Sequence, residues 1–339
     1  MRPKHRCRAW YRRDVFVGAI GLLTVVLGAG PAHAQTNSGA LDLLKPIGAR
    51  ATAMGSAYAA EAGSEAIWWN PAGIARMTKP EFGIDHFENF LVAGGDAVSL
   101  ILPAGAVGVF GLSARLFNYD TIPSTGLNGE EAGVINPRSI ALGATFAASF
   151  GQRLSAGLSF RVFQFSVSCL GVCTDALATN PYTGFLDLGL QLRPSANGPL
   201  QLGVVLSNLG PNLQVHDQAQ ADALPARLHV GASYQPSSAG WDPGLRVKGT
   251  AEFVSSLALS ADELHLGAEL GYLSGTTVLF VRGGAVLQKT SGEGDRGFEP
   301  SFGLGLASGR VQVDIARVVE SLSTNLGKPP TYISIRVGL

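Results

Sequence analysis

The chain has few charged, aromatic and cysteine residues. Among its 339 residues, 15% are charged, 8% are aromatic and 3 are cysteines. Long apolar runs are also scarce, and a single stretch, residues 15–30, resembles a membrane helix. The scarcity of long apolar runs excludes a bundle of membrane helices. The 44 glycines are too many for an ordinary helical enzyme.

The apolar stretch belongs to a predicted secretory signal peptide. Six basic residues precede it, and Ala32-His33-Ala34 follows it with the small-residue pattern of a cleavage site. A basic start, a short apolar run and such a site together predict that residues 1–34 are removed before Gln35. Arg12 and Arg13 resemble a twin-arginine signal, but an ordinary basic start is the preferred interpretation.

The remaining chain is mildly acidic and keeps two cysteines. The signal peptide holds 6 of the 25 basic and 1 of the 25 acidic residues, which leaves 19 and 24 and a net charge of −5. That charge argues against nucleic acid as a partner. Cys169 and Cys173 would close a small disulfide in an exported protein, with free thiols as the alternative. Further metal ligands do not cluster near them in the sequence, so we expect no metal and no cofactor.

Short runs that alternate apolar and polar residues fill the chain from residue 81 onward. In the last run, Ile333, Ile335 and Val337 alternate with Ser334 and Arg336. In a strand, such alternation places the apolar side chains on one face and the polar ones on the other. We predict fourteen strands, near residues 81–90, 94–103, 106–118, 138–150, 152–167, 181–193, 198–208, 225–236, 244–255, 263–273, 276–287, 297–307, 309–319 and 330–339.

The gaps between these runs alternate between tight and long. Bacterial outer-membrane barrels show this pattern, with an even number of strands, short periplasmic turns and long outer loops. About ten tilted residues cross the hydrocarbon layer, which fits the runs. The sequence therefore predicts an all-β fold, an antiparallel transmembrane β-barrel of about 14 strands over residues 81–339. It would lie in lipid of the bacterial outer membrane with both termini periplasmic. A water-soluble protein of antiparallel sheets is the alternative.

Residues 35–80 lack the strand pattern and are predicted to form a plug. They are rich in small residues, and Asn70-Pro71 has the residue types of a helix start. The two neighbouring indoles, Trp68 and Trp69, need burial. We therefore predict an N-terminal hatch, a plug inside the barrel lumen that could open. Its gate candidates are Trp68, Trp69, Asn70, Pro71, Ala72 and Gly73, although helix capping alone would explain these residue types.

Residues 48–75 read GARATAMGSAYAAEAGSEAIWWNPAGIA. This stretch resembles the N-terminal signature of the PorV/PorQ family, a compact branch of the FadL-like outer-membrane transport proteins. The shared positions are Gly48, Ala49, Arg50, Met54, Gly55, Ala57 and the six gate candidates. The resemblance implies a fourteen-stranded barrel with an inward-folded hatch. Leu339 departs from the aromatic terminal residue that the barrel-assembly machinery usually reads.

Ionisable residues occupy many of the predicted inward positions of the strands. Polar side chains are expected on the inner face of a barrel whatever its function. They would pair with one another or with the hatch, or a subset of them would line a pore. The lumen-lining candidates are Arg161, His229, Lys248, Glu252, His265, Glu269, Arg282, Asp314 and Arg336.

The motifs of known enzymes are weak in this sequence. Ser207, with His216 and Asp217, has residue types of a hydrolase but no nucleophile elbow. We therefore predict a non-catalytic barrel that transports hydrophobic or amphipathic molecules through a hatch-gated lumen.

Two other roles stay open. Resemblance to PorV-type proteins also implies a type IX secretion shuttle, which would bind secreted proteins or secretion subunits at the cell surface. Its partner-facing candidates are the predicted outer loops 119–137, 209–224 and 320–329. A purely structural barrel is the third role.

Overall fold

The computed structural model describes residues 39–89, 93–126, 130–171, 180–214, 221–237, 242–257, 261–289, 296–319 and 329–339. The predicted signal peptide lies outside these residues. Within them, no helix has the length and apolar character needed to span a membrane.

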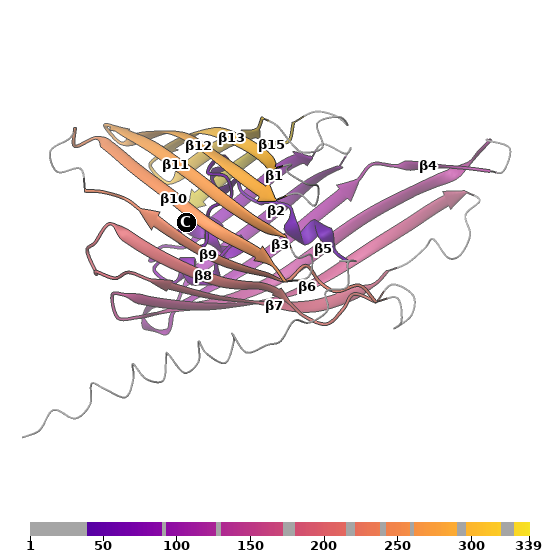
Figure 1. Cartoon of the computed structure of the whole chain (residues 1–339), viewed down its shortest axis with the longest axis horizontal. Coiled ribbons are helices and arrows are strands. Elements are labelled where there is room, and N and C mark those ends of the chain that lie inside the picture. The colour runs from indigo at the N-terminus through magenta and orange to yellow at the C-terminus, as the bar shows by residue number, and fades with distance from the viewer. Residues whose placement is uncertain are drawn as a thin grey trace, which may run out of the picture. The chain divides into compact units, whose positions relative to one another are not determined.

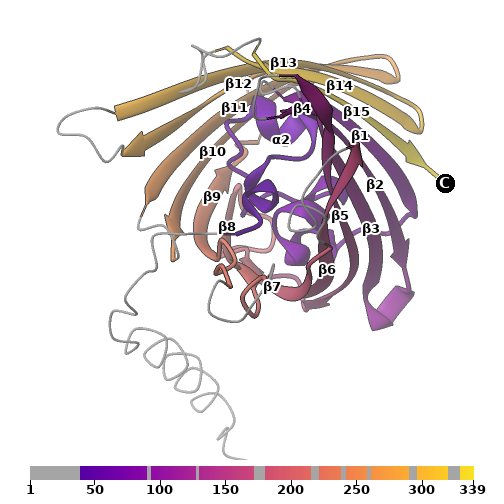
Figure 2. The same ribbon diagram turned by 90° about the vertical axis from the view of Figure 1, so that its right-hand side faces the viewer.

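Antiparallel strands close into one ring (Figures 1 and 2). In the described residues the wall has fourteen strands: β1 (Glu81–Asn89), β2 (Ala93–Pro103), β3 (Val109–Tyr119), β5 (Glu131–Phe150), β6 (Leu154–Gly171), β7 (Tyr182–Leu192), β8 (Leu200–Leu209), β9 (Arg227–Tyr234), β10 (Leu245–Ser256), β11 (Asp262–Ser274), β12 (Thr277–Lys289), β13 (Arg296–Ser308), β14 (Val311–Val318) and β15 (Thr331–Gly338). Strand β1 pairs with β15 and β3 pairs with β5, which closes the ring. The predicted fourteen-stranded antiparallel barrel is confirmed.

The alternation in the sequence sets the two faces of the wall. On β7, Leu186, Leu188 and Leu190 point outward and are 38%, 44% and 52% exposed. Asp187 and Gln191, between and beyond them, point inward and are buried. An apolar outer face over a polar inner face is the arrangement of a barrel wall that meets lipid.

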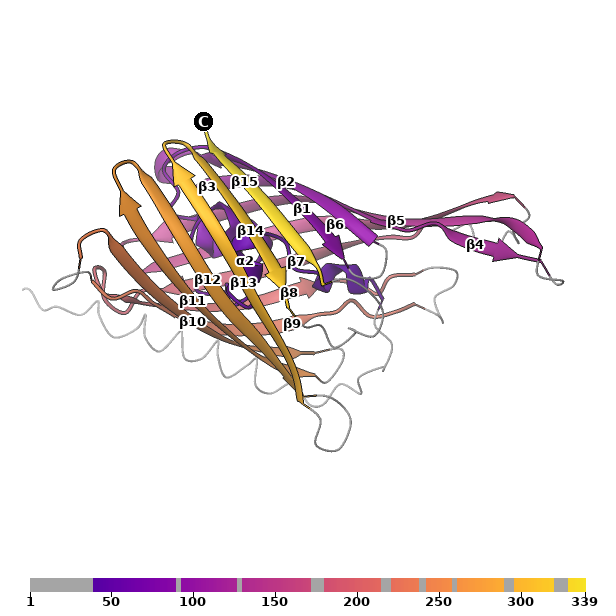
Figure 3. The same ribbon diagram turned by 90° about the horizontal axis from the view of Figure 1, so that it is seen from above.

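The wall is extended at the end where the long gaps lie. A further short strand, β4 (Ile122–Thr125), pairs with the start of β5, and the ends of β5 and β6 continue past the ring (Figures 1 and 3). The prediction of an outer loop over 119–137 is therefore wrong for residues 119, 122–125 and 131–137, which lie in strands. Cross-strand apolar pairs, such as Ile122 with Ile135 and Val134 with Leu170, hold this extension together.

Residues 39–80 fold inside the ring and are called the inner segment below (Figure 2). It contains three short 3-10 helices, η1 (Leu41–Leu44), η2 (Ser64–Trp68) and η3 (Pro71–Ile74), and one short α-helix, α2 (Ala49–Ala53). A fourth 3-10 turn, η4 (Gly105–Val107), joins β2 to β3. Tyr58, Ile67 and Ile74 of the inner segment are fully buried and pack with Ile101 and Val109 of the wall.

Glycines on the inner face of the wall let the backbone of the inner segment approach closely. They pair in register across neighbouring strands, Gly157 with Gly189, Gly203 with Gly231 and Gly267 with Gly284. A Cβ atom at Gly189 would lie 2.0 Å from Asn70 Oδ1, and one at Gly203 would lie 2.1 Å from the carbonyl oxygen of Ala59. These distances are too short for any side chain, which gives the high glycine content a structural reason.

Candidate functional site

The gate candidate Asn70 fastens the inner segment to the wall. Its side chain is fully buried, and Oδ1 accepts a hydrogen bond from the backbone N–H of Ala72 at 3.0 Å, which caps η3. Its Nδ2 donates to the carbonyl oxygens of Ala59 and of Leu190 in β7. Pro71 is the first residue of η3. The predicted helix start at Asn70-Pro71 is therefore present, as a 3-10 turn.

The two indoles lie at a boundary inside the lumen. Trp69 Nε1 donates to the carbonyl oxygen of Ile47 at 2.9 Å, and its ring lies 6.1 Å from that of Tyr58. The guanidinium of Arg161 lies over the ring of Trp68, 5.9 Å from its centre. Trp68 and Trp69 face a pocket on the long-loop side, whereas Tyr58 faces a second cavity on the short-turn side. The inner segment thus separates two spaces of the lumen.

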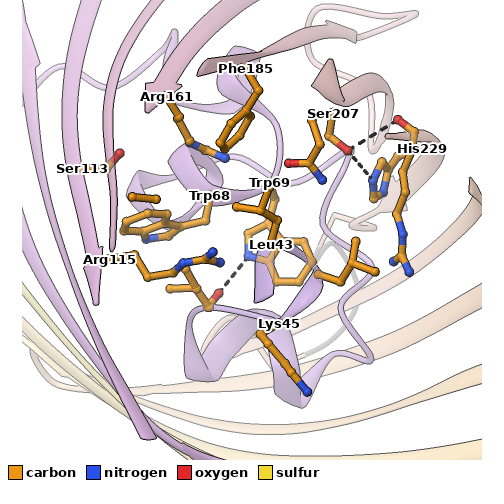
Figure 4. Close-up of a pocket in the computed structure, with 15 residues that line it drawn as sticks. Leu43, Lys45, Trp68, Trp69, Ser113, Arg115, Arg161, Phe185, Ser207 and His229 are labelled. Carbon is orange, nitrogen blue, oxygen red and sulfur yellow. Dashed lines mark hydrogen bonds between the residues drawn. The ribbon is translucent and has the colours of Figure 1, made fainter. Parts of the chain in front are cut away.

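The pocket on the long-loop side, called the outer pocket below, combines apolar and cationic walls (Figure 4). The inner segment supplies the indoles, Leu43, Leu44, Lys45 and Ile47. Strands supply the rest: Ser113, Arg115, Ala141, Arg161, Phe185, Ser207, Asn208, Arg227 and His229. An apolar floor beside several cations suits a molecule with an apolar body and a polar or anionic head.

Several buried N–H groups of the outer pocket have no hydrogen-bond acceptor among the described residues. They are Trp68 Nε1, Arg115 Nη2, Arg161 Nε and Arg227 Nε. Two of these guanidinium groups are otherwise paired, Arg161 with Asp187 at 2.7 Å and Arg227 with Glu263 at 3.3 Å. A buried donor without an acceptor is costly, so such groups are poised to bind an acceptor on a ligand.

A network of ion pairs joins the inner segment to the opposite side of the wall. Arg50 contacts Glu61 at 2.7 Å and Glu269 at 2.9 Å, and Lys248 also contacts Glu61, at 2.8 Å. Burial acts to raise the pKa of Glu61, but Arg50 and Lys248 hold it below its usual value. Arg282 continues the network along the wall, to Glu269 and Asp314, both at 2.6 Å.

Glu65 is a buried carboxyl whose pKa is shifted in the opposite direction from that of Glu61. Burial raises its pKa to about 7, although Arg336, 3.9 Å away, acts to lower it. The same Arg336 is committed to Asp85, at 2.6 Å. Gly48, whose φ is +98°, leaves the space that the Glu65 carboxyl fills, since a Cβ there would overlap it at 1.5 Å.

No protein-family model and no curated protein sequence matches this chain. Solved structures do match its fold. The toluene transporter TbuX of Ralstonia pickettii has a TM-score of 0.59 and 14% identity, over 87% of this chain and 99% of that one. The toluene transporter TodX of Pseudomonas putida has a TM-score of 0.52 and 14% identity, over 89% and 98%. A FadL homologue of Pseudomonas aeruginosa has a TM-score of 0.51 and 12% identity, over 86% and 98%.

The chain has the FadL-like barrel fold. At these identities the likeness extends to the fold alone, and the finer resemblance to PorV/PorQ proteins stays a prediction. The solved barrels named above are described as transporters or as a FadL homologue, not as enzymes.

In this FadL-like barrel, all nine lumen-lining candidates lie on inner-facing positions of the strands, in three groups. Arg161 lies at the outer pocket, beside Trp68 and paired with Asp187. His229 pairs with Glu252, whose other oxygen accepts the backbone N–H of Ala59, and His265 pairs with Glu263. The ion-pair network of Arg50 and the Arg336–Asp85 pair hold the others: Lys248, Glu269, Arg282, Asp314 and Arg336.

Sequence reasoning missed several charged residues of both spaces. Arg50 and Glu61 lie in the small-residue stretch, where the strand pattern gives no orientation. Arg115 and Arg227 lie on strands, and they could have been identified because they fall at alternate positions that face the lumen. Cys169, near the end of β6, is disulfide-bonded, but Cys173 lies outside the described residues, so the predicted pairing stays a prediction.

Proposed function

We propose that this protein is an outer-membrane transporter for molecules with an apolar body and a polar or anionic head. The observation that supports this proposal is the outer pocket, where two indoles and Phe185 lie beside buried guanidinium N–H groups that have no acceptor among the described residues. The apolar outer wall and the FadL-like fold support a place in the outer membrane. Lipid and the barrel-assembly machinery would then be its partners, with both termini periplasmic.

The cargo class follows from the lining of the pocket. Solved neighbours are described as a toluene transporter and a monoaromatic hydrocarbon channel, whose cargo is neutral. Arg115, Arg161 and Arg227 would gain nothing from such a molecule, because a hydrocarbon offers no acceptor. A carboxylate-headed amphiphile satisfies both the indoles and the guanidinium groups.

The inner segment would act as the hatch on the transport route. Cargo in the outer pocket touches Trp68 and Trp69, and the second cavity begins beyond Tyr58. Passage therefore requires a displacement of the inner segment around the residue pair Trp69 and Tyr58. Cargo would move down its own gradient.

Fluorescence quenching by a brominated fatty acid tests the cargo proposal. Trp68 and Trp69 line the outer pocket, so their quenching reports binding there once Trp241→Phe has removed the other tryptophan that remains after the predicted cleavage. The variants Arg115→Gln and Arg161→Gln should each weaken binding about tenfold, since a hydrogen bond to a charged group contributes about 1.5–3 kcal/mol.

Arg153→Gln, an exposed change in the β5–β6 turn, is the matched control and should bind like the unchanged protein. Equal affinity of all four proteins, or tighter binding of toluene than of the fatty acid, would contradict the cargo proposal.

The secretion-shuttle role has one feature in its favour, the extension formed by β4 and the ends of β5 and β6. Ile122 and Leu170 on it are 51% and 66% exposed, beyond the ring of the barrel. Protein extracted in mild detergent from its native membranes discriminates the two roles. A bound apolar acid without protein supports transport, and a co-purifying secreted protein supports the shuttle.

A further inference from the structure

A serine, a histidine and a glutamate form a hydrogen-bonded chain in the wall of the outer pocket. Ser207 Oγ lies 3.2 Å from His229 Nε2, and His229 Nδ1 lies 2.8 Å from Glu252 Oε1 (Figure 4 shows the first contact). The three residues come from neighbouring strands, β8, β9 and β10. The sequence alone suggests His216 and Asp217 as partners of Ser207, and both lie outside the described residues.

Glu252 is placed to orient the histidine. Its side chain is 2% exposed, and its second oxygen accepts the backbone N–H of Ala59 at 2.6 Å, so the carboxylate cannot rotate freely. When His229 donates its Nδ1 proton to Glu252, Nε2 keeps the lone pair that accepts the Ser207 hydroxyl proton. This is the order of roles in a serine hydrolase triad.

The backbone at Ser207 departs from a regular strand. Between the pairs Leu186–Leu209 and Leu188–Leu206, strand β8 carries one more residue than β7, which makes a bulge at this serine. The next residue, Asn208, has a φ of +58° although it is not glycine. The carboxylate of Asp187 accepts its N–H at 2.8 Å and fixes this conformation. Bulges and left-handed residues of this kind re-aim a side chain, here toward the pocket that Ser207 lines.

A donor for a developing oxyanion lies directly across the strand pair. Arg227 is the register partner of Ser207, so both side chains rise from the same face of the wall. Its Nε–H is buried and has no acceptor among the described residues. The competing acceptor for the Ser207 hydroxyl, the carbonyl oxygen of Arg227, is farther away, at 3.5 Å.

We propose that Ser207, His229 and Glu252 hydrolyse carboxylic esters of apolar acyl chains in the outer pocket. Ser207 Oγ attacks the ester carbonyl carbon while His229 Nε2 takes the hydroxyl proton. The carbon–oxygen bond to the alcohol then breaks, and the alcohol leaves with the proton from His229. Water, deprotonated by His229, attacks the acyl-serine carbon, the acid is released, and the proton returns to Ser207. Glu252 stays ionised throughout.

Labelling with a fluorophosphonate tests the nucleophile in the purified barrel in detergent. The unchanged protein should gain one adduct, located on Ser207 by peptide mass spectrometry. It should also hydrolyse p-nitrophenyl octanoate. Ser207→Ala should lose the adduct and lower the hydrolysis rate at least about 100-fold, and Glu252→Gln should lower that rate by a smaller factor.

Ser99→Ala is the matched control, because Ser99 is a buried inner-face serine outside the outer pocket. It should keep both the adduct and the rate. Folding of each variant is checked by the gel shift between unheated and heated samples. Absence of an adduct on Ser207 in the unchanged protein, or equal rates in folded Ser207→Ala and Ser99→Ala, would overturn the proposal. These measurements do not depend on transport, so either proposal can fail alone.

Discussion

Gly189 leaves the space that the carboxamide of Asn70 occupies. In Gly189→Ala, the added Cβ would lie 2.0 Å from Asn70 Oδ1, so the inner segment has to move off the wall. Overpacking of this kind costs about 1–3 kcal/mol. We expect faster proteolysis of residues 39–80 in the folded barrel, measured on gels. Gly249→Ala, where nothing lies within 4 Å of the new Cβ, should be cut like the unchanged protein.

Glu65 gives the inner segment a dependence on pH. Its pKa in the folded protein, about 7, exceeds the usual 4.5, so its protonated form favours docking. The contribution is complete below pH 4.5 and is lost as the pH rises through 7. Charged or titratable groups around it are Arg336, Asp85, Asp314, Arg50 and Tyr58.

Acrylamide quenching of the tryptophans should therefore increase between pH 5.5 and pH 8.5. Glu65→Gln should remove most of that increase. Glu61, whose pKa lies below its usual value, stays charged over the whole range, so Glu61→Gln should keep the increase. An identical pH response in the unchanged protein and in Glu65→Gln would exclude Glu65 as its source.

At the scale of elements, Arg50 contacts two carboxylates, Glu61 within the inner segment and Glu269 on β11 of the wall. In Arg50→Met, both carboxylates stay buried with part of their compensating charge removed, which costs about 3–5 kcal/mol when a buried pair is broken. We expect a looser inner segment and a higher ion conductance in planar bilayers. Lys79→Met, an exposed change in the same segment, should conduct like the unchanged protein. Equal conductance of both variants would show that Arg50 does not hold the lumen closed.

The wall strands were predictable because their alternation is local. In runs such as β7, apolar and polar residues alternate between direct neighbours in the sequence. The fourteen predicted strands correspond to the fourteen strands of the wall in the described residues. Strand β4 was not predicted, because its stability comes from pairing with β5 rather than from its own four residues.

The site was predictable only in part, because some of its contacts depend on how distant segments of the chain come together. Arg161, His229 and Glu252 were identified because alternate residues of a strand face the lumen. The contact of Ser207 with His229 was not predictable, because it depends on which strands become neighbours. Arg50 and Glu61 pair through the folding of a segment without a regular period.

At the scale of the whole barrel, the strands that close the ring also carry the residues that line the outer pocket. The outer pocket draws on the inner segment and on six neighbouring strands of the wall, from β3 through β5 to β9. A change that widens the ring would therefore disturb the pocket, even where no lining residue is replaced.

The contact between Ala49 and Ser334 sets an order of events during assembly. The backbone N–H of Ala49 donates to Ser334 Oγ at 2.7 Å, across 285 positions of sequence, and Ser334 lies on β15, which pairs with β1. The inner segment is synthesised before the wall, but the surface of the wall that it packs against is complete only when β15 has paired with β1. Contacts of such long separation form late. An assembling barrel therefore stays open until β15 is in place, and the docking of the inner segment marks a closed ring.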